Sequence, residues 1–414
     1  MVRIDLSPSR HDRDRDPRLG RAPAPPLAAP PGPGARRPAR LLAVLVTLLL
    51  AAAIVVAGIG LHVLLVTSLS LPGGHGADSF VSPWPRATPL GRQAVSGIAA
   101  RVDSGLVDIN VVLGYPGERG SATGMVLTPS GEVLTNNHVV NGATSITVTD
   151  VGNGRTYHAH VTGYDRAHDV AVLQLEGASG LRMVTLGASS KLTPGMSVTA
   201  IGNAGGAGGT PKASAGLITA LGQAITASDS SGSNAQRLSG LIEIDAEVRP
   251  GDSGGPLVND AGEVVGMNAA TSASFASQPA ANQAYAIPID EALAIARTIE
   301  QGVTTATVHS GPTAFLGVEL VPPGQQGAEL SGPGARRTTG AVLGGTIAGY
   351  PAQKAGLAQG DVITAVNGRA VTSAPGLMDV LGAYHPGDSV HVQWVDPSGQ
   401  AHGAAITLAS GPPA

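Results

Sequence analysis

A run of 26 uncharged residues, positions 41–66, most constrains how this chain of 414 residues can fold. The run reads LLAVLVTLLLAAAIVVAGIGLHVLLV, and Thr47 and His62 are its only polar members. A helix of about 20 apolar residues crosses the roughly 30 Å hydrocarbon core of a bilayer. Helices of soluble proteins usually keep a polar stripe, which this run lacks, so a buried core helix is the less favoured alternative. We therefore expect one transmembrane helix over residues 41–66.

A cleavable signal peptide is the competing interpretation of this run. The apolar region of a signal peptide has about 7–15 residues and ends at a small-residue cleavage site. Here the run is longer, and Ser68-Leu69-Ser70 is a poor cleavage signal. The sequence favours an uncleaved anchor over a protein secreted after cleavage near residue 70.

The charges on either side of the run give its orientation. Residues 1–40 carry nine Arg and four Asp, whereas the remaining 374 residues carry 16 basic and 25 acidic residues. By the positive-inside rule, the N-terminus lies in the cytoplasm and the chain after residue 66 lies outside the cell membrane. The Pro-rich residues 1–40 cannot build a core and are expected to be a disordered basic tail. Beside a membrane span, this tail favours anionic lipid over nucleic acid as a partner.

The extracytoplasmic part reads as mainly β. After a linker at 67–94, short β-branched runs such as DVAVLQL and LIEIDAEV alternate with Gly, Asn, Asp and Ser clusters, which favours a barrel or sandwich. A helix is predicted at 290–301, with Asp290 as its N-cap and Gly302 after its end. The chain has no cysteine, so disulfides and catalytic thiols are excluded. The polar tract 303–312 is a linker candidate between a domain at 95–302 and one at 313–410.

Three segments carry residues for nucleophilic catalysis. In PGDSGGP (250–256), Ser253 lies among glycines that permit a tight turn and leave backbone N–H groups to bind an oxyanion. His138 in TNNHVV ends an apolar run and is a candidate general base, and Asp169 in DVAVLQL precedes another and is a candidate orienting acid. The order His, Asp, Ser is that of chymotrypsin and differs from the orders in subtilisins and α/β-hydrolases.

These segments closely resemble the HtrA/DegP family of trypsin-fold serine proteases, especially its secreted actinobacterial PepA branch. The resemblance implies a chymotrypsin-like double β-barrel, with His138 and Asp169 on the first barrel and Ser253 on the second. It also implies an oxyanion hole formed by the N–H groups of Gly251 and Ser253. No cofactor is implied.

Two positions depart from the usual HtrA pattern. Asp252 stands where many relatives have Asn, and we interpret it as a local hydrogen-bond acceptor. Glu247 and Val248 precede Ser253 where trypsin-like enzymes place the specificity pocket. Glu247 would favour basic substrate side chains if it faced the pocket, although an orientation toward solvent is favoured.

Other histidines give weaker patterns. His158 and His160 share one face of a predicted strand, but no third ligand lies nearby in the sequence, so no metal site is expected. His168 adjoins Asp169, and strand alternation would point the two side chains apart.

The last segment, 313–410, resembles a bacterial PDZ domain through GYPAQKAGL, GDVI and VNG. A PDZ domain adds a peptide strand to a sheet edge and binds the terminal carboxylate with backbone N–H groups. The resemblance places the carboxylate loop at Phe315, Leu316, Gly317 and Val318. A helix at 374–384 would form the other wall through Leu377, Leu381 and Tyr384, although core packing is the alternative role for these three.

The resulting hypothesis is a membrane-anchored serine endopeptidase that acts on envelope or misfolded proteins and binds exposed C-termini. A PDZ-bearing chaperone or scaffold with latent or absent protease activity is the alternative. HtrA relatives commonly form trimers, so a homotrimer is an expected assembly.

Overall fold

The computed structural model describes residues 91–114, 118–203, 208–227, 236–269, 283–321 and 339–414. All of them lie in one compact unit, residues 82–414. The basic tail, the transmembrane prediction for 41–66 and nearly all of the linker at 67–94 fall outside the described residues. Within the described ranges, no helix is both long and apolar enough to span a membrane.

The first half of the unit is a closed antiparallel barrel. Its strands are β1 (Leu106–Leu113), β2 (Glu118–Val126), β3 (Glu132–Thr135), β4 (Ala143–Asp150), β5 (Thr156–Asp165) and β6 (Val170–Leu175). They pair in the order β5-β4-β1-β2-β3-β6, and β6 also pairs with β5, which closes the barrel. The short helix α3 (Asn137–Val140) follows β3 directly.

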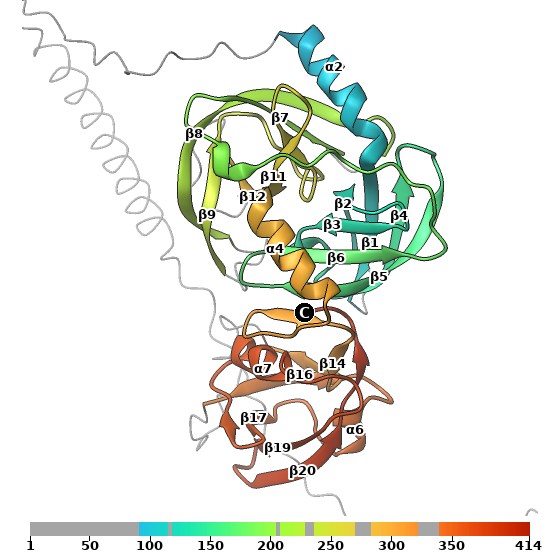
Figure 1. Ribbon diagram of the computed structural model, residues 1–414. Helices are drawn as coiled ribbons and strands as arrows, with labels where there is room; N and C mark the ends of the chain where they lie inside the picture. Colours follow the sequence, from blue (N-terminus) through green and yellow to red (C-terminus); the bar gives the residue numbers. More distant parts are fainter. Residues whose placement is uncertain (1–90, 115–117, 204–207, 228–235, 270–282, 322–338) are drawn as a thin grey trace, which may run out of the picture. The chain divides into compact units, whose positions relative to one another are not determined.

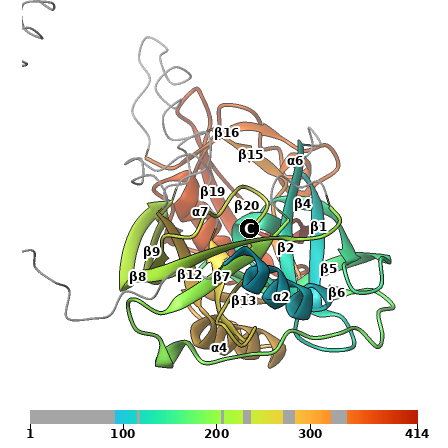
Figure 2. The same cartoon turned by 90° about the horizontal axis from the view of Figure 1, so that it is seen from above.

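The second half is another closed barrel, paired in the order β10-β11-β12-β9-β8-β7. Its strands are β7 (Ser197–Gly202), β8 (Lys212–Ala227), β9 (Gln236–Ile244), β10 (Pro256–Val258), β11 (Val264–Ala269) and β12 (Ala284–Pro288). β8 and β9 of this barrel lie on the opposite side of the view from β4 and β5 of the first (Figure 2). The expected pair of six-stranded barrels is therefore confirmed.

Helix α4 (Ile289–Glu300) joins the two barrels. It contacts β5 and β6 of the first barrel and β11 and β12 of the second (Figure 1). The prediction of a helix here is confirmed, but the predicted cap is wrong. Asp290 lies inside the first turn, and its carboxylate accepts a hydrogen bond from the Ser190 N–H at 2.9 Å. Ser190 belongs to the short 3-10 helix Ser189–Lys191, which is 100 residues away along the chain.

Two elements flank this core. Helix α2 (Arg92–Val102), followed by the 3-10 turn Asp103–Gly105, contacts β7 and β8 of the second barrel. The segment 303–312, which was expected to be a linker, contains β13 (Val308–Ser310). β13 pairs with β5 through Val308↔Asp165, so this segment is an added edge strand of the first barrel.

The C-terminal domain is a small sheet with helices beside it. β15 (Val318–Leu320), β16 (Ala341–Thr346), β17 (Val362–Val366), β19 (Ser389–Val395) and β20 (Ala401–Thr407) pair in that order. β18 (Arg369–Ala370) pairs with β17, and β14 (Thr313–Phe315) pairs with β21 (Ala409–Gly411). The helices are α6 (Pro351–Lys354) and α7 (Ala374–Leu381).

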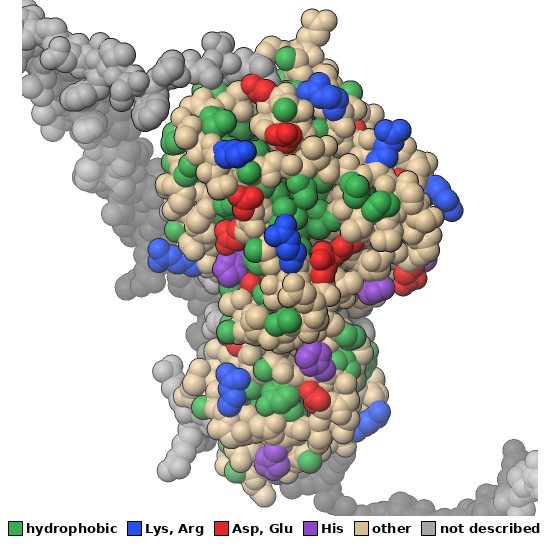
Figure 3. Space-filling view, viewed as in Figure 1, with side chains coloured by type: hydrophobic (Ala, Val, Ile, Leu, Met, Phe, Trp, Pro, Cys, Tyr) green, Lys and Arg blue, Asp and Glu red, His purple; other side chains and the backbone are tan. Residues whose placement is uncertain are grey.

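Each part has its own apolar core, which in a chain without cysteine is not reinforced by disulfides. In the first barrel this core includes Ile109, Val133 and Leu173, and in the C-terminal sheet it includes Leu343, Ile363 and Val392. On the face drawn in Figure 3, Lys and Arg side chains are dispersed among Asp and Glu, and the described residues form no continuous basic surface there.

Candidate active site

His138 stands where β3 ends and α3 begins. Val133 and Leu134 of β3 are buried in the protein interior, and the chain then turns at Asn136 into α3. The side chain of His138 is 47% exposed, so its ring can meet a substrate. A buried strand end thus fixes the backbone of His138 while its ring remains reachable.

Asp169 holds His138 by two hydrogen bonds. Its Oδ2 lies 2.8 Å from His138 Nδ1, and its Oδ1 accepts a 2.8 Å hydrogen bond from the His138 backbone N–H. A carboxylate is an acceptor only, so Nδ1 carries the proton in this contact. In the neutral ring, Nε2 is then left as an acceptor.

Ser253 completes the arrangement from the second barrel. Its Oγ lies 3.0 Å from His138 Nε2, on the side of the ring opposite Asp169. The Ser253 carbonyl accepts a 2.9 Å hydrogen bond from the Thr123 N–H of β2, which ties the turn before β10 to the first barrel. The structure therefore brings together the three residues that the motifs singled out, in the order Asp169, His138, Ser253.

Two glycines shape the turn around Ser253. Gly251 has φ +100° and Gly254 has φ +77°, a region that favours glycine. A Cβ on Gly254 would come within 2.2 Å of Thr135 Oγ1 and 2.3 Å of the Thr123 carbonyl. The backbone must pass this close to β2 and β3, so the glycine after the serine is sterically required.

The candidate oxyanion hole is held by Thr123. Its hydroxyl donates to the Gly251 carbonyl at 2.7 Å and accepts from the Asn203 N–H at 2.8 Å. Among the described residues, no acceptor takes the Gly251 N–H.

The pKa of His138 is shifted by two opposing effects. Loss of water around the ring nitrogens lowers it, but the negative charge of Asp169 and the hydrogen bond that His138 donates to this carboxylate raise it by more, so the pKa lies above its usual range. The imidazolium that forms when His138 accepts a proton is thereby stabilised.

Asp252 directly precedes Ser253 in the turn and is buried. Its Oδ2 accepts a 2.9 Å hydrogen bond from the Arg249 N–H, in line with its expected role as a local acceptor. Burial is the main effect that raises the pKa of this carboxyl group. Gly202 is the last residue of β7. A Cβ at this position would lie 2.7 Å from Asp252 Oδ1, so glycine at 202 makes room for the aspartate.

Glu247 and Val248 lie before this turn and differ in exposure. Glu247 is 60% exposed, and its Oε1 lies 2.6 Å from Arg249 Nη2 and 2.9 Å from Arg249 Nε. Val248 is half-buried and packs against the second-barrel core. The structure thus places the Glu247 carboxylate on the surface, where Arg249 engages it.

The expected peptide-binding residues of the C-terminal domain fall into two groups. Leu316 and Leu377 are each 1% exposed and belong to the domain core. Leu377 therefore has the alternative role, core packing. Phe315, Val318 and Leu381 are less buried. At Gly317 (φ +78°), a Cβ would lie 2.1 Å from Tyr350 Cβ, so the loop can pass Tyr350 only with glycine there.

Sequence reasoning missed two supporting residues. Thr123 positions the Gly251 carbonyl, and Asn136 donates from Nδ2 to the Asp169 carbonyl at 3.0 Å. Neither has a motif of its own, although Asn136 lies within TNNHVV and is fully buried, which is unusual for an amide.

Two family profiles match the chain at the expected places. A trypsin-like peptidase domain matches residues 122–267, and a PDZ domain matches residues 315–395. The first match contains His138, Asp169 and Ser253, and the second begins at Phe315.

Several curated serine proteases are similar to this chain. Serine protease PepD of Mycobacterium tuberculosis is 31% identical over 353 residues, 81% of this chain and 70% of PepD. Putative serine protease HhoA of Synechocystis is 34% identical over 63% of this chain and 64% of its own length. The periplasmic pH-dependent serine endoprotease DegQ of Escherichia coli is 32% identical over 66% of this chain and 55% of its own length. The chain therefore spans less than two thirds of the last two relatives.

Proposed function

Because the chain belongs to the HtrA family of trypsin-like serine proteases, we propose that it is an endopeptidase of the cell envelope that cleaves proteins through an acyl-enzyme on Ser253. The observation that carries this proposal is the contact of His138 with Asp169 on one ring nitrogen and with Ser253 on the other, at 2.8 and 3.0 Å. Each distance is a hydrogen-bond distance.

The geometry supports the following reaction. Ser253 Oγ attacks the scissile carbonyl while His138 Nε2 takes the hydroxyl proton, and Asp169 stabilises the imidazolium that results. His138 then gives the proton to the leaving amine, which leaves an ester on Ser253. In the second half, His138 Nε2 removes a proton from water, and the water oxygen attacks the acyl carbon and displaces Ser253 Oγ. His138 then returns the proton to Ser253 Oγ, which releases the acid product and regenerates the serine hydroxyl.

The tetrahedral intermediate needs donors for its oxyanion. The N–H groups of Gly251 and Ser253 are the proposed donors, and the Thr123 hydroxyl supports them by fixing the Gly251 carbonyl. Donors that are already oriented lower the barrier because they need no rearrangement as charge develops.

The rest of the proposal concerns location and substrate. The apolar run at 41–66 anchors the enzyme in the membrane with its protease domain outside, and the PDZ domain binds exposed apolar C-termini of misfolded proteins. Separation of cells into membrane and soluble fractions, together with N-terminal sequencing of the mature chain, tests the anchor. Recovery in the soluble fraction with an N-terminus near residue 70 would contradict it.

The proposed activity is tested with an unfolded protein such as casein. Incubation with the full chain should give internal cleavage products, which mass spectrometry can map, and Ser253→Ala should give none. Cleavage that persists in Ser253→Ala at the wild-type rate would assign the activity to another group or to a contaminant.

A further inference from the structure

The turn between β5 and β6 holds Asp169 in a sparsely populated backbone conformation. Asp169 has φ +56°, and Asn367 is the only other residue besides glycine with positive φ in the part of the chain that the structure describes. Such a conformation persists where its surroundings over-determine it. The orientation of the Asp169 carboxylate toward His138 therefore depends on what holds residues 165–169.

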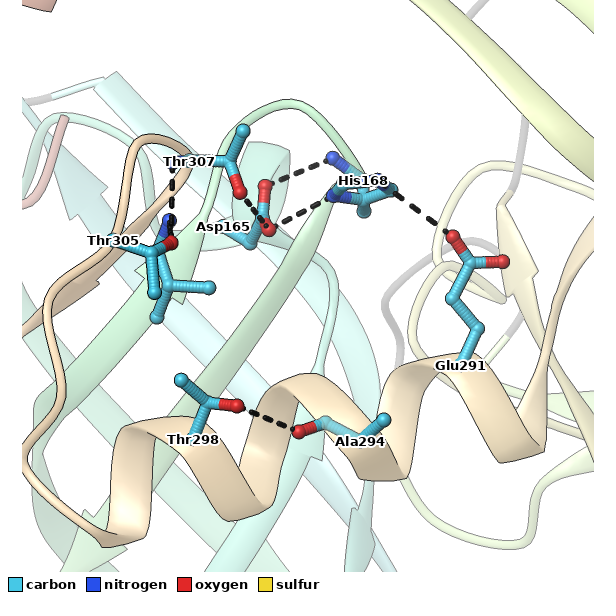
Figure 4. A network of polar contacts seen from close by, with 8 residues as sticks. Asp165, His168, Glu291, Ala294, Thr298, Thr305 and Thr307 are labelled. Atoms are coloured by element: carbon cyan, nitrogen blue, oxygen red, sulfur yellow. Dashed lines mark hydrogen bonds and ion pairs between the residues drawn. The ribbon is translucent and has the colours of Figure 1, made fainter.

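Asp165 holds the first half of this turn. Its side chain is only 1% exposed, at the end of β5. Oδ1 accepts a 3.1 Å hydrogen bond from the His168 backbone N–H, and Oδ2 lies 2.8 Å from His168 Nδ1 (Figure 4). An aspartate that binds a backbone N–H a few residues later locks a turn. His168 precedes Asp169 directly, so these contacts fix the peptide that leads into the triad residue.

The contacts of Asp165 also explain why the side chains of His168 and Asp169 point apart, as the sequence predicted. The side chains of His168 and Asp169 do point to different partners, but the cause is a turn and not strand alternation. β6 begins only at Val170. His168 turns back onto Asp165, whereas Asp169 turns toward His138.

A third donor to Asp165 comes from beyond the two barrels. Thr307 donates from Oγ1 to Asp165 Oδ2 at 2.9 Å (Figure 4). Thr307 is itself fixed, because its N–H donates to Thr305 Oγ1 at 3.3 Å and the next residue begins β13, which pairs with β5. On the other side, His168 Nε2 lies 3.8 Å from Glu291 Oε1 of α4. A carboxylate this deeply buried requires such donors.

We propose that Asp165 is a positioning residue for the triad: with His168 and Thr307 as donors, it holds the β5–β6 turn in the conformation that aims Asp169 at His138. The proposal rests on the proposed function. It assigns a role to Thr307, which lies outside the matched trypsin-like segment and 138 residues after Asp169. A misplacement of about 1 Å in a catalytic arrangement can cost about 100-fold in rate.

The test compares His168→Ala and Thr307→Val with matched controls. Thr307→Ser keeps the hydroxyl and should rescue activity. His160→Ala and Thr298→Val are controls, because His160 is 59% exposed and the Thr298 hydroxyl donates only to Ala294 of its own helix. We expect kcat for a peptide substrate to fall about 10- to 100-fold in the two test variants, with KM within about twofold. The controls and Thr307→Ser should stay within about twofold of the wild type.

A second measurement separates positioning from general destabilisation. We expect the His138 Nδ1 proton that is donated to Asp169 to give a low-field NMR resonance, which should shift or broaden in His168→Ala and Thr307→Val but not in the controls. Unchanged kcat in both folded variants, or a fall in kcat with this resonance unaltered, would overturn the proposal. The resonance is measured without turnover, so it tests the positioning role even if the wild-type protein cleaves no substrate, a result that would contradict only the proposed function.

Discussion

His138 Nε2 lies 3.0 Å from Ser253 Oγ although the two residues are 115 positions apart. The contact crosses from the first barrel to the second. The Thr123 N–H of β2 binds the Ser253 carbonyl, so the first barrel also fixes the serine turn. The site therefore forms only when both barrels are folded and docked.

The raised pKa of His138 predicts the pH dependence of activity. Only the neutral ring can accept the Ser253 proton, so kcat/KM should rise with pH through a midpoint above the usual histidine value of 6.5. Asp169→Asn removes the charge that raises the pKa, so the midpoint should move down. In this variant kcat should also fall by about 10⁴ because the required tautomer is lost. A pH–rate profile checks both effects, and an unchanged midpoint in Asp169→Asn would contradict them.

The raised pKa of His138 affects stability in the opposite direction, because it makes the free energy of unfolding decrease as pH rises. The folded state binds the His138 proton more tightly than the unfolded chain does. The His138–Asp169 contact therefore contributes fully below about pH 6.5, and this contribution is lost as pH rises through the folded-state pKa. Activity should thus increase over the pH range in which this part of the stability decreases.

Thr123→Val should weaken the oxyanion hole without changing the shape of the side chain. The variant loses the hydroxyl that fixes the Gly251 carbonyl and leaves the Asn203 N–H without its acceptor. We expect kcat to fall about tenfold or more, less than the roughly 100-fold or greater loss on removing an oxyanion donor itself. The control is Thr144→Val. In the wild type the exposed Thr144 hydroxyl donates to the Val112 carbonyl on the same barrel. Equal kcat for the two variants would show that Thr123 has no such role.

Glu132 and Glu300 should make the free energy of unfolding fall as pH rises from mildly acidic to neutral. Burial, the hydrogen bond to Glu300 and the charge of Glu300 raise the pKa of Glu132 to about 7. Between pH 4.5 and about 7 the folded state retains a proton that the unfolded chain has released, so stability falls as pH rises through this range and changes little above it. Glu300→Gln should reduce the fall in Tm between about pH 5 and pH 7. The exposed variant Glu176→Gln is the control, and an identical fall in Tm in all three proteins would refute this account.

Glu247→Ala should leave the side-chain preference of the enzyme unchanged. The Glu247 carboxylate is exposed and engaged by Arg249, and an ion pair of this kind contributes at most about 1 kcal/mol to stability. A peptide library cleaved by both proteins and read by mass spectrometry checks this. Selective loss of cleavage after Arg or Lys in the variant would instead place Glu247 in the specificity pocket.

The mainly β character and the three residues that meet at the site could be predicted because each leaves a pattern in the local sequence, whereas the double barrel was implied by the family resemblance. Ser253 lies among glycines that its turn requires, and His138 and Asp169 adjoin apolar strands. The supporting contacts could not be predicted in this way. Thr123 meets Gly251 across 128 positions, and Thr307 meets Asp165 across 142. No short-range pattern records such pairs, because they arise only when the strands are assembled.

Asp290 is a case in which a local sequence pattern predicted the wrong contact. Its type and position match a helix N-cap, yet in the folded chain its carboxylate binds the Ser190 N–H instead. A tertiary donor replaced the local one, and the helix started one residue earlier, at Ile289. The prediction of a linker at 303–312 failed for a related reason. Part of this polar tract forms the strand β13 because it pairs with the edge of β5 in the folded chain.

Labelling with a fluorophosphonate probe is the most direct test of the central claim, an activated Ser253. The folded full-length protein should be labelled at Ser253, as identified by peptide mapping. Labelling should disappear in Ser253→Ala and become much slower in His138→Ala. A folded wild-type protein that is not labelled even with unfolded substrate present, or is labelled at another residue, would contradict the account.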